Sequence, residues 1–427
     1  MKILFSVLDN LLRISERLGF IEIEKVVMDS RKVNKGDIFF AINNGNNYID
    51  QVLKDGASIV IADRYSGEDK RVFKVDSSVK FMQDLAREYR KALGLKVIAI
   101  TGSNGKTTTK DMIYSVLSKK YITKKTEGNY NNHIGLPYTI LQLTEKDQVV
   151  VLEMGMSGFN EIDLLSSIAK PDIGVITNIG DSHLEFLKTR ENVFKAKTEL
   201  LNYISSENLY IVGDDPYLKN LLGNKIGFDK ENNFVIERFN DSNDGMNFYI
   251  DNEEYSLNLN GKHNALNAGM AVAIGKRFGL AYEEIKSGLK NLELTPMRFQ
   301  KIETEKVIYI NDAYNASPIS MEFSLNTFDK LYNNIKKILV LGDMLELGEK
   351  EIEFHQEVIK KALNIKSDKI YLYGERMKKA YDLLEKNDKI RCFDNKGEII
   401  NLIDGEKEKV AVLLKGSRGM KLEEIIR

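Results

Sequence analysis

The sequence predicts an α/β protein of three domains, and three observations support this fold class. The chain has 427 residues, too many for one hydrophobic core, because domains usually hold ~100–200 residues. Short apolar runs, typical of buried parallel strands, alternate with helical spacing in two separate stretches. A proline-containing segment at 294–299 divides these stretches. We therefore expect domains over residues 1–93, 94–297 and 298–427.

Residues 1–93 combine short strands with helical segments. Strands are expected at 37–42 and 58–62, and a helix at 81–93. The turn at 43–47 reads Asn-Asn-Gly-Asn-Asn, residue types that accept a left-handed backbone. This pattern predicts a small α/β domain.

The second stretch has continuous apolar runs separated by helical segments, which predicts a parallel sheet with both faces covered. The expected strands are 97–100, 149–152, 173–177 and 209–212. Between 233 and 259, two alternating strands flank the polar turn Asp251–Glu254, so an antiparallel hairpin should be appended to the sheet. Helices at about 263–278 and 282–291 should close the domain.

The segment Leu294-Thr295-Pro296-Met297-Arg298-Phe299 is expected to be a linker, because proline disfavours helix at the preceding residue. After it, strands are expected at 307–310, 338–341, 370–373 and 410–414, with helical spacing between them. This order predicts a doubly wound, Rossmann-like domain.

Composition excludes several classes of protein. The 62 Lys and Arg residues nearly balance the 63 Asp and Glu residues, so no overall field attracts nucleic acid or anionic lipid. The single cysteine, Cys392, excludes an intrachain disulfide and fits a reducing compartment. No run approaches the ~20 apolar residues of a membrane span, and the N-terminus lacks the apolar region of a signal peptide. We expect a cytoplasmic protein without membrane insertion.

A glycine-rich turn between a strand and a helix predicts a phosphate site. It reads Thr101-Gly102-Ser103-Asn104-Gly105-Lys106-Thr107-Thr108. Backbone N–H groups and the helix dipole converge on an anion there, Lys106 adds a positive charge, and the Thr107 hydroxyl can bind Mg²⁺. The common P-loop has a further glycine where this chain has Ile100. A plain surface turn is the alternative, which the strand and helix on either side disfavour.

Other polar residues follow the next strands. Glu153 comes directly after the strand at 149–152, where a carboxylate can hold Mg²⁺, and His183 follows the strand at 173–177 and can ligate a second metal. Each alone would be read as a solvated or capping residue. Lys195 and Lys197 lie two apart on a helix, so they point to different faces and one of them can enter the site.

Residues on the far side of the expected site come from the end of the second domain and from the third. His263, Asn264 and Asn267 share one face at a helix start, where amides can cap the helix or bind a nucleobase. Arg298 in the linker could reach the γ-phosphate of a nucleotide by a hinge motion, and Asp312 could accept ribose hydroxyls. The loops 342–348 and 415–420 also follow strands and are candidates for a second substrate.

These residues together resemble the Mur ligase family over essentially the whole chain. Met28-Asp29-Ser30-Arg31, followed by Gly36-Asp37-Ile38-Phe39, resembles the family motif that holds a uridine nucleotide. The other family motifs then follow in order: Thr101–Thr108, Glu153, His183, Lys197, Gly261–Asn267, Arg298 and Asp312.

Within the family, the chain is most similar to the branch that adds D-alanyl-D-alanine to UDP-N-acetylmuramoyl-tripeptide. The stretches that carry this likeness are 128–137, 153–158, 312–318 and 341–348. The Asp-Asn-Pro-Arg stretch of the branch that adds the third amino acid is absent from the sequence of the last domain. One departure is Asn46-Asn47-Tyr48-Ile49-Asp50, where the family usually has an Asp-Gly-His-like stretch.

The resemblance implies an ATP-dependent ligase that works through an acyl phosphate in peptidoglycan precursor synthesis. It implies three kinds of domain: one binding the UDP-muramoyl-peptide, one binding ATP, and one binding the incoming dipeptide. Its cofactors would be two Mg²⁺ ions and a carbamylated lysine, and its partners only small molecules, with a monomeric protein.

The site roles that follow from the motifs and from the resemblance are these. Lys106, His183, Lys197 and Arg298 would be catalytic; Gly102 to Thr108, Asn267, Arg298 and Asp312 would bind ATP; and Thr107, Glu153, His183 and carbamylated Lys197 would bind metal. The substrate-binding residues would be Ser30, Arg31, Asn129, Asn131, Asn132, Tyr314, Asn315, Lys415, Ser417 and Arg418.

Three alternatives stay open at the level of the sequence. Another ligase of the family would add a single amino acid to UDP-muramoyl-dipeptide, or glutamate to a folate. A regulator that keeps the fold would bind ATP without releasing phosphate. A small-molecule kinase would leave the first domain and Arg298 without a role.

Overall fold

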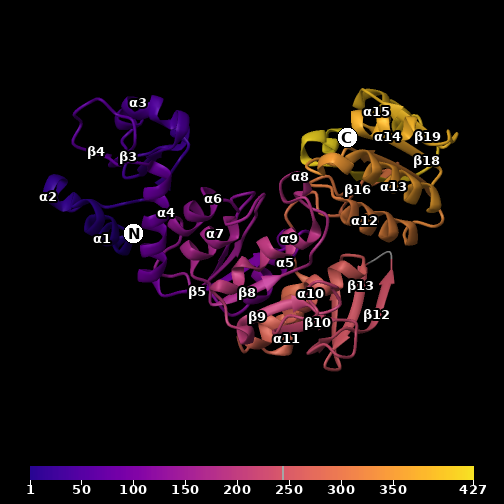
Figure 1. Ribbon diagram of the computed structural model, residues 1–427, viewed down its shortest axis with the longest axis horizontal. Helices are drawn as coiled ribbons and strands as arrows, with labels where there is room; N and C mark the ends of the chain where they lie inside the picture. Colours follow the sequence, from indigo (N-terminus) through magenta and orange to yellow (C-terminus); the bar gives the residue numbers. More distant parts are fainter. Residues whose placement is uncertain (243–244) are drawn as a thin grey trace.

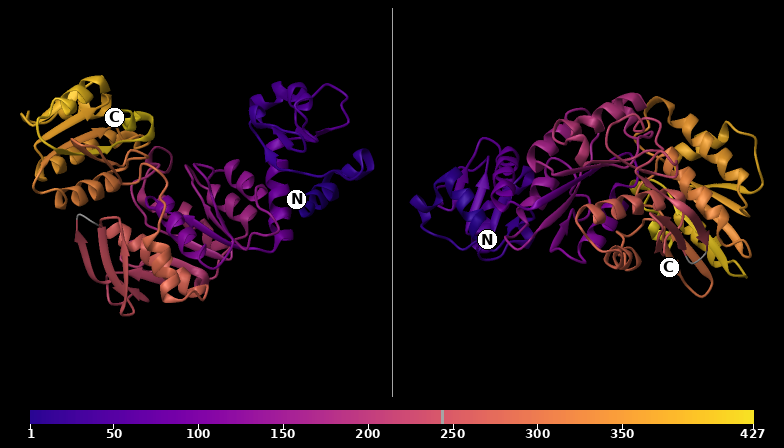
Figure 2. Two further views of the ribbon diagram at one scale, coloured as in Figure 1. Left: turned by 180° about the vertical axis from the view of Figure 1, so that it is seen from behind. Right: turned by 90° about the horizontal axis from the view of Figure 1, so that it is seen from below.

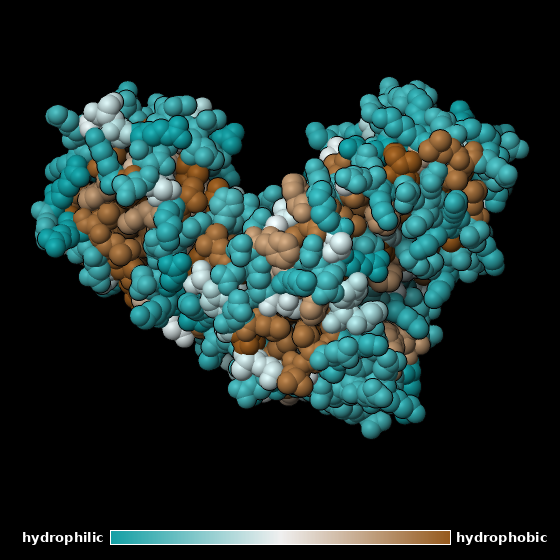
Figure 3. Space-filling view, viewed as in Figure 1, coloured by the Kyte–Doolittle hydropathy of each residue, from teal (hydrophilic) through white to brown (hydrophobic). Residues whose placement is uncertain are grey.

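The protein has three lobes arranged as an open V, with the central lobe between the other two (Figures 1, 2 and 3). The structure is a computed structural model that describes residues 1–242 and 245–427. Each lobe contains a mainly parallel sheet with helices packed against it. The expected α/β fold of three domains is confirmed, while the domain boundaries stay predictions. Within the described ranges, no helix has the length and apolar character needed to cross a membrane.

The first lobe is a four-stranded parallel sheet in the order β1-β2-β3-β4. Its strands are β1 (Val26–Val27), β2 (Ile38–Ala41), β3 (Ile59–Ala62) and β4 (Val72–Lys74). Its helices are α1 (Lys2–Leu12), α2 (Ile14–Leu18) and α3 (Ile49–Lys54), with the 3₁₀ turns η1 (Ser30–Lys32) and η2 (Asn43–Tyr48). The continuous burial of β2 and β3 follows from their uninterrupted apolar sequences.

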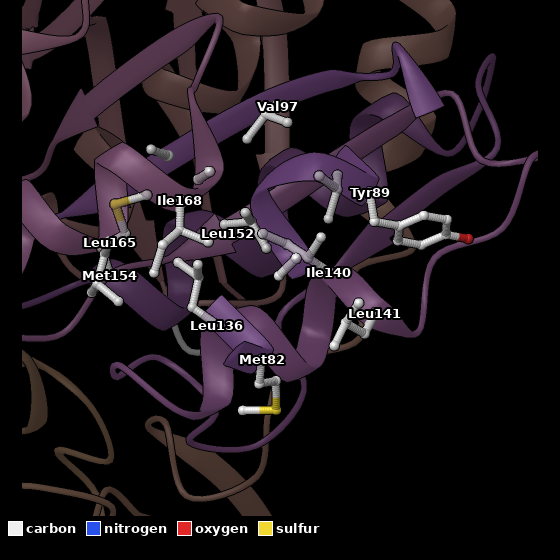
Figure 4. Packing of buried hydrophobic residues seen from close by; sticks show 14 of the residues in the cluster. Met82, Tyr89, Val97, Leu136, Ile140, Leu141, Leu152, Met154, Leu165 and Ile168 are labelled. Carbon is white, nitrogen blue, oxygen red and sulfur yellow. The ribbon is translucent and has the colours of Figure 1, made fainter. Parts of the chain in front are cut away.

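Helix α4 (Ser78–Leu93) joins the first lobe to the central lobe and packs on both. It begins at Ser77, whose hydroxyl accepts the N–H of Lys80, and ends at Gly94 in the left-handed conformation. Its buried face, including Met82 and Tyr89, contacts the core residues of the central lobe (Figure 4). The two lobes therefore share one hydrophobic core across the expected boundary at residue 93.

The central lobe contains a seven-stranded parallel sheet in the order β11-β10-β9-β8-β5-β7-β6. Its strands are β5 (Lys96–Thr101), β6 (Thr123–Lys125), β7 (Val149–Glu153), β8 (Ile173–Ile176), β9 (Leu209–Val212), β10 (Asn224–Gly227) and β11 (Phe234–Val235). Its helices are α5 (Lys106–Leu117), α6 (Gly135–Leu141), α7 (Glu161–Ala169), α8 (Leu184–Leu187), α9 (Arg190–Thr198), α10 (Lys262–Arg277) and α11 (Tyr282–Lys290), with 3₁₀ turns η3 (Glu199–Asn202) and η4 (Ser206–Asn208).

Strand β5 shows why the apolar runs are continuous. Val97 and Ala99 face the core shared with α4, α6 and α7, whereas Ile98 and Ile100 face the core beneath α5, α10 and α11. Both faces are covered, so every position from Val97 to Ile100 is apolar. The carboxyl end of β5 then opens at Thr101 toward the glycine-rich loop.

The expected hairpin around Asp251 is present and has a third strand. Strands β12 (Glu237–Ser242), β13 (Gly245–Ile250) and β14 (Glu253–Leu257) form a separate antiparallel sheet. The turn consists of Asp251 and Asn252, both with positive φ, the conformation of a two-residue hairpin loop. Glu253 and Glu254, expected in the turn, instead begin β14.

The last lobe has six strands in the order β15-β16-β20-β17-β18-β19, and only β15 is antiparallel. The strands are β15 (Gln300–Glu303), β16 (Val307–Asn311), β17 (Lys336–Gly342), β18 (Lys369–Tyr373), β19 (Ile390–Phe393) and β20 (Val410–Lys415). The helices are α12 (Pro318–Lys330), α13 (Glu351–Asn364), α14 (Glu375–Asp382) and α15 (Lys396–Asp404), with 3₁₀ turns η5 (Gly348–Lys350), η6 (Arg418–Met420) and η7 (Leu422–Ile425). Separate cores on its two faces make it doubly wound.

Candidate functional site

The glycine-rich loop lies between β5 and α5, and its two glycines are structurally required. Gly102 has φ of +145° and Gly105 has φ of +80°, values that L side chains rarely adopt. A Cβ on Gly102 would collide with the Thr177 hydroxyl. The first N–H groups of α5 have no carbonyl partner within the helix, so the loop presents donors where an anion would bind.

Lys106, the first residue of α5, folds back over the loop. Its Nζ donates to the carbonyl of Gly102 at 2.7 Å and to that of Ser103 at 3.3 Å. Burial lowers the pKa of Lys106, and the nearby charge of Glu153 opposes this shift. The ammonium therefore lies at the mouth of the loop, where a phosphate can displace its carbonyl partners.

Glu153 at the end of β7 is held in place by two polar side chains. The Thr107 hydroxyl donates to its Oε2 at 2.9 Å, and the Asn131 amide donates to its Oε1 at 2.9 Å. Arg298 reaches this group from the linker, since its Nη2 donates to Thr107 Oγ1 at 3.0 Å. Asn131, predicted to bind substrate, thus has a partner inside the protein.

Thr107 and Glu153 supply hydroxyl and carboxylate oxygens, which are the ligands that Mg²⁺ prefers. Among residues 1–242 and 245–427, no cluster of three His, Cys, Asp or Glu side chains suited to a metal occurs. A cation here would have one protein carboxylate, which fits Mg²⁺ because that ion keeps several waters and shares substrate phosphates.

His183 and Lys197 have different surroundings. His183 Nδ1 lies 2.7 Å from Glu346 Oε2 of the last lobe, and this contact lowers the pKa of Glu346. Lys197 is almost completely buried, and burial, followed by repulsion from Lys106, lowers its pKa well below the ordinary value. Lys195 is exposed, so the two lysines do point to different environments.

The last lobe contributes a second polar cluster around Asp312. Its Oδ1 accepts the N–H of Phe299 at 3.1 Å, and its Oδ2 accepts from Ser324 at 2.5 Å and pairs with Lys415 at 2.9 Å. Burial lowers the pKa of Lys415. Asp312 therefore contacts the linker, helix α12 and Lys415 while it also lines the cavity between the lobes.

A cavity of about 350 Å³ separates the central and last lobes and collects most of the predicted site residues. They are Ser103, Asn104, Gly105, Lys106, Thr107, Thr108, Asn131, Asn132, Glu153, His183, Asn267, Arg298, Asp312, Tyr314, Asn315 and Lys415. Two buried donors on its wall, Asn104 Nδ2 and Arg298 Nε, have no hydrogen-bond partner within the described ranges. Because buried donors are normally paired, they indicate a ligand rich in acceptor oxygens.

The cavity also contains residues that sequence reasoning missed. Ser320, Phe323 and Ser324 lie on one face of α12 and line it. Phe323 stacks on His263 of α10, with ring centroids 5.1 Å apart, and burial lowers the pKa of His263 to about 4. The i, i+3, i+4 spacing after Pro318 is the signal that could have revealed this face.

Several predicted site residues lie outside the cavity. Gly102 and Lys197 are buried, whereas Asn129 is exposed. Ser417 is buried, and its hydroxyl accepts the N–H of Leu345, so it supports the 342–348 loop. Arg418 is exposed and pairs with Glu423.

Ser30 and Arg31 belong to turn η1 in the first lobe, apart from the cavity. Arg31 is exposed and pairs with Asp29 at 2.8 Å. In the stretch that departs from the family, the Asn46 amide donates to Ala41 O, Asn43 O and Asp63 Oδ1. Asn46 therefore shapes its own loop.

Comparison with known proteins identifies the family. Residues 100–275 match the Mur ligase middle domain, and residues 297–418 match the domain described as the Mur ligase, glutamate ligase domain. A UDP-N-acetylmuramoyl-tripeptide–D-alanyl-D-alanine ligase of Bacillus subtilis is 40% identical over 424 residues, covering 95% of this chain and 93% of that protein. The chain belongs to the Mur ligase family.

Solved structures agree with this Mur ligase over nearly its whole length. A crystal structure of MurF from Acinetobacter baumannii has a TM-score of 0.89 at 28% identity, covering 99% of this chain and 97% of that one. A MurF ligase from Thermotoga maritima, solved in complex with ADP, has a TM-score of 0.84 at 29% identity, covering 94% and 96%. The likeness extends over all three lobes of the ligase.

Proposed function

We propose that this Mur ligase joins D-alanyl-D-alanine to UDP-N-acetylmuramoyl-tripeptide with cleavage of ATP to ADP and phosphate. The observation that carries this assignment is the 40% identity, over 95% of the chain, to a ligase named for that reaction. The product would be the UDP-muramoyl-pentapeptide precursor of peptidoglycan. The cavity supports the proposal because it combines a phosphate loop with unpaired donors.

ATP would bind with its phosphates on the loop at 102–108. Lys106 lies over the loop carbonyls and Arg298 contacts Thr107. Both would neutralise the outer phosphates, a large part of what phosphoryl transfer requires. Asn267 and the His263–Phe323 pair would contact the nucleoside. Asp312 would accept hydrogen bonds from the ribose hydroxyls, or would hold the linker through the N–H of Phe299.

Thr107 and Glu153 would hold Mg²⁺, and His183 with carbamylated Lys197 would hold a second ion. Bound there, Mg²⁺ would neutralise charge on the transferred phosphoryl group. The lowered pKa of Lys197 favours the neutral amine, the form that reacts with carbon dioxide. The His183–Glu346 contact would have to loosen for His183 to bind a metal.

The chemistry would proceed through an acyl phosphate. The terminal carboxylate of the tripeptide attacks the γ-phosphorus, and the bond to ADP breaks. The amine of D-alanyl-D-alanine then attacks the acyl carbon, forming the amide and releasing phosphate. Closure of the last lobe over the central lobe would exclude water from this hydrolysable intermediate.

The two other substrates would approach from opposite lobes. Ser30 and Arg31 would bind the uridine nucleotide, and Asn129, Asn131 and Asn132 would lie along the muramoyl-peptide. Tyr314, Asn315, Lys415, Ser417 and Arg418 would contact the dipeptide directly or by shaping its loops. A monomeric state and a cytoplasmic location stay predictions from the sequence.

The decisive experiment measures ADP and phosphate release with UDP-muramoyl-tripeptide and D-alanyl-D-alanine, omitting each in turn. We expect release only when both are present, with mass spectrometry showing the pentapeptide product. Single amino acids offered with UDP-muramoyl-dipeptide, and glutamate offered with a folate, serve as controls. Release that is independent of the dipeptide would overturn the assignment.

A further inference from the structure

The first turns of α5 carry two fully buried charges that have no place in the reaction described above. Lys110 and Asp111 are 1% and 0% exposed. Burying a charge is costly unless it is paired and hydrogen-bonded. The partners of these two side chains therefore indicate what they do.

The partners of Lys110 lie beside the magnesium-binding carboxylate. Its Nζ donates to the carbonyl of Thr126 at 2.8 Å and lies 4.0 Å from Glu153 Oε2. The Thr126 hydroxyl in turn accepts the N–H of Glu153 at 2.9 Å. Lys110 thus lies near Oε2 of Glu153, the same oxygen that accepts from the Thr107 hydroxyl.

Asp111 connects this cluster to the interdomain linker. Its Oδ1 accepts from Lys125 at 2.7 Å and lies 3.7 Å from Lys110, while its Oδ2 accepts the backbone N–H of Thr295 at 2.8 Å. Thr295 is three residues before Arg298. The carboxylate is therefore the contact that ties the start of the linker to the helix carrying the phosphate loop.

The backbone of the linker is strained around Arg298, so hydrogen bonds such as that from the Thr295 N–H to Asp111 are needed to hold its conformation. Met297 and Phe299, the residues on either side, have φ of +64° and +52°. Non-glycine residues keep this left-handed conformation only where the surroundings impose it. Asp111 holds the central-lobe side at Thr295, and Asp312 holds the last-lobe side at Phe299.

We propose that Asp111 is a positioning residue of the ligase reaction. By accepting the Thr295 N–H, it fixes the linker so that Arg298 reaches Thr107 and the outer phosphates of ATP. The contacts form a closed ring through Thr107, Glu153, Lys110, Asp111, the linker and Arg298. The proposal rests on the proposed function, which supplies the role of Arg298.

A double-mutant cycle tests this role. In Asp111→Asn, one carbonyl oxygen replaces two carboxylate oxygens and cannot serve both Lys125 and Thr295. In the wild-type background, we expect Asp111→Asn to lower kcat for dipeptide-dependent phosphate release about tenfold or more. In the Arg298→Ala background, the same substitution should lower kcat less than about twofold. Where Arg298→Ala turns over too slowly, ATP binding measured by calorimetry replaces kcat in the same cycle.

The matched control is Asp172, which also accepts a backbone N–H and pairs with two cations, but at the opposite end of β5. Asp172→Asn should lower the melting temperature without coupling to Arg298. If Asp111→Asn does not fold, Asp111→Ala combined with Lys125→Met removes the acceptor and keeps the cluster neutral.

The possible outcomes separate the two proposals. A wild-type enzyme without dipeptide-dependent release contradicts the proposed function. The positioning role alone is contradicted if the wild-type enzyme is active but Asp111→Asn lowers kcat by the same factor with Arg298 present and with Arg298 replaced by alanine. The same holds for the variant that combines Asp111→Ala with Lys125→Met. The positioning role of Asp111 is also contradicted if a folded Asp111 variant keeps the wild-type kcat and the wild-type affinity for ATP.

Discussion

Lys197 has surroundings that would favour covalent modification of its amine. It is 1% exposed, and burial together with the charge of Lys106 lowers its pKa well below the ordinary value. A lowered pKa increases the share of the neutral amine, which is the nucleophilic form of lysine. Its carbamate would carry a negative charge, which would remove the repulsion with Lys106.

We therefore expect Lys197 to react with carbon dioxide in the folded enzyme. Activity should rise with added bicarbonate, and ¹³C-labelled bicarbonate should give a carbamate signal in the NMR spectrum of the protein. Lys197→Gln should abolish that signal and reduce kcat about 10–100-fold, as losses around a metal site usually do.

Lys195 provides the matched control because it lies on the same helix and is exposed. Lys195→Gln should leave both the carbamate signal and kcat unchanged. A carbamate signal that persists in folded Lys197→Gln, or full activity of that variant, would contradict the prediction.

Individual residues also show where the sequence could predict the site. Glu153, Lys106 and Arg298 were expected to lie near one another because of their places after strands or in the linker, and all three line the cavity. Their chemical roles stay predictions. Asn131 and Asn132 were predicted to bind substrate, yet Asn131 holds Glu153, and Asn132 accepts the N–H groups of Ile134 and Gly135 at the start of α6. An amide can donate and accept, so its residue type does not reveal which partner it has.

At the level of elements, the glycine-rich loop depends on one close contact with the neighbouring strand. Thr177, just after β8, donates from its hydroxyl to the carbonyl of Asn104 at 2.5 Å. A Cβ on Gly102 would strike that hydroxyl. The geometry of the loop is thus set by β8 as well as by its own sequence.

The variant Gly102→Ala should therefore damage both stability and ATP binding. A φ of +145° lies in a region that L residues rarely adopt and costs them about 1–3 kcal/mol, and the collision with Thr177 adds to this. We expect a lower melting temperature and a KM for ATP raised about tenfold or more, because displaced N–H groups bind phosphate poorly.

The variant Gly94→Ala is a control that introduces backbone strain without a steric clash, so it distinguishes these two effects of Gly102→Ala. Gly94 also has a positive φ, of +67°, but nothing lies within 4 Å of its Cβ position. That variant should lose some stability and keep the wild-type KM for ATP. If Gly102→Ala folds with an unchanged KM for ATP, the close contact with Thr177 does not control the loop.

Helix α4 marks the limit of predicting elements from sequence. The amphipathic pattern at 81–93 correctly indicated a helix, but an apolar face does not reveal which neighbour covers it. In the structure, Tyr89 donates to the carbonyl of Leu143 at 2.7 Å and Arg90 Nε to that of Ala169 at 2.8 Å, both in the central lobe. The boundary expected at residue 93 follows the change in sequence pattern, whereas the core continues across it.

At the level of the whole molecule, the two interfaces of the central lobe differ in kind. The first lobe shares an apolar core with it through α1, α4 and α6. The last lobe meets it at a cavity, through the His263–Phe323 ring stack, and mainly through polar contacts, including Ser317 with Asn104 at 3.0 Å and His183 with Glu346 at 2.7 Å. Large apolar interfaces resist relative motion, whereas small polar ones permit it. The last lobe is therefore the one expected to move.

Substrates should shift the protein toward the arrangement seen in this structure, in which the last lobe contacts the central lobe. ATP would contact both sides of the polar interface, and a ligand that binds one arrangement better increases its population. We expect the radius of gyration from small-angle scattering to fall when ATP and UDP-muramoyl-tripeptide are added together. Glu346→Ala, which removes the His183 contact, should enlarge the ligand-free protein and widen that difference. An unchanged radius in the wild-type protein, with both ligands shown to be bound, would contradict the predicted movement of the last lobe.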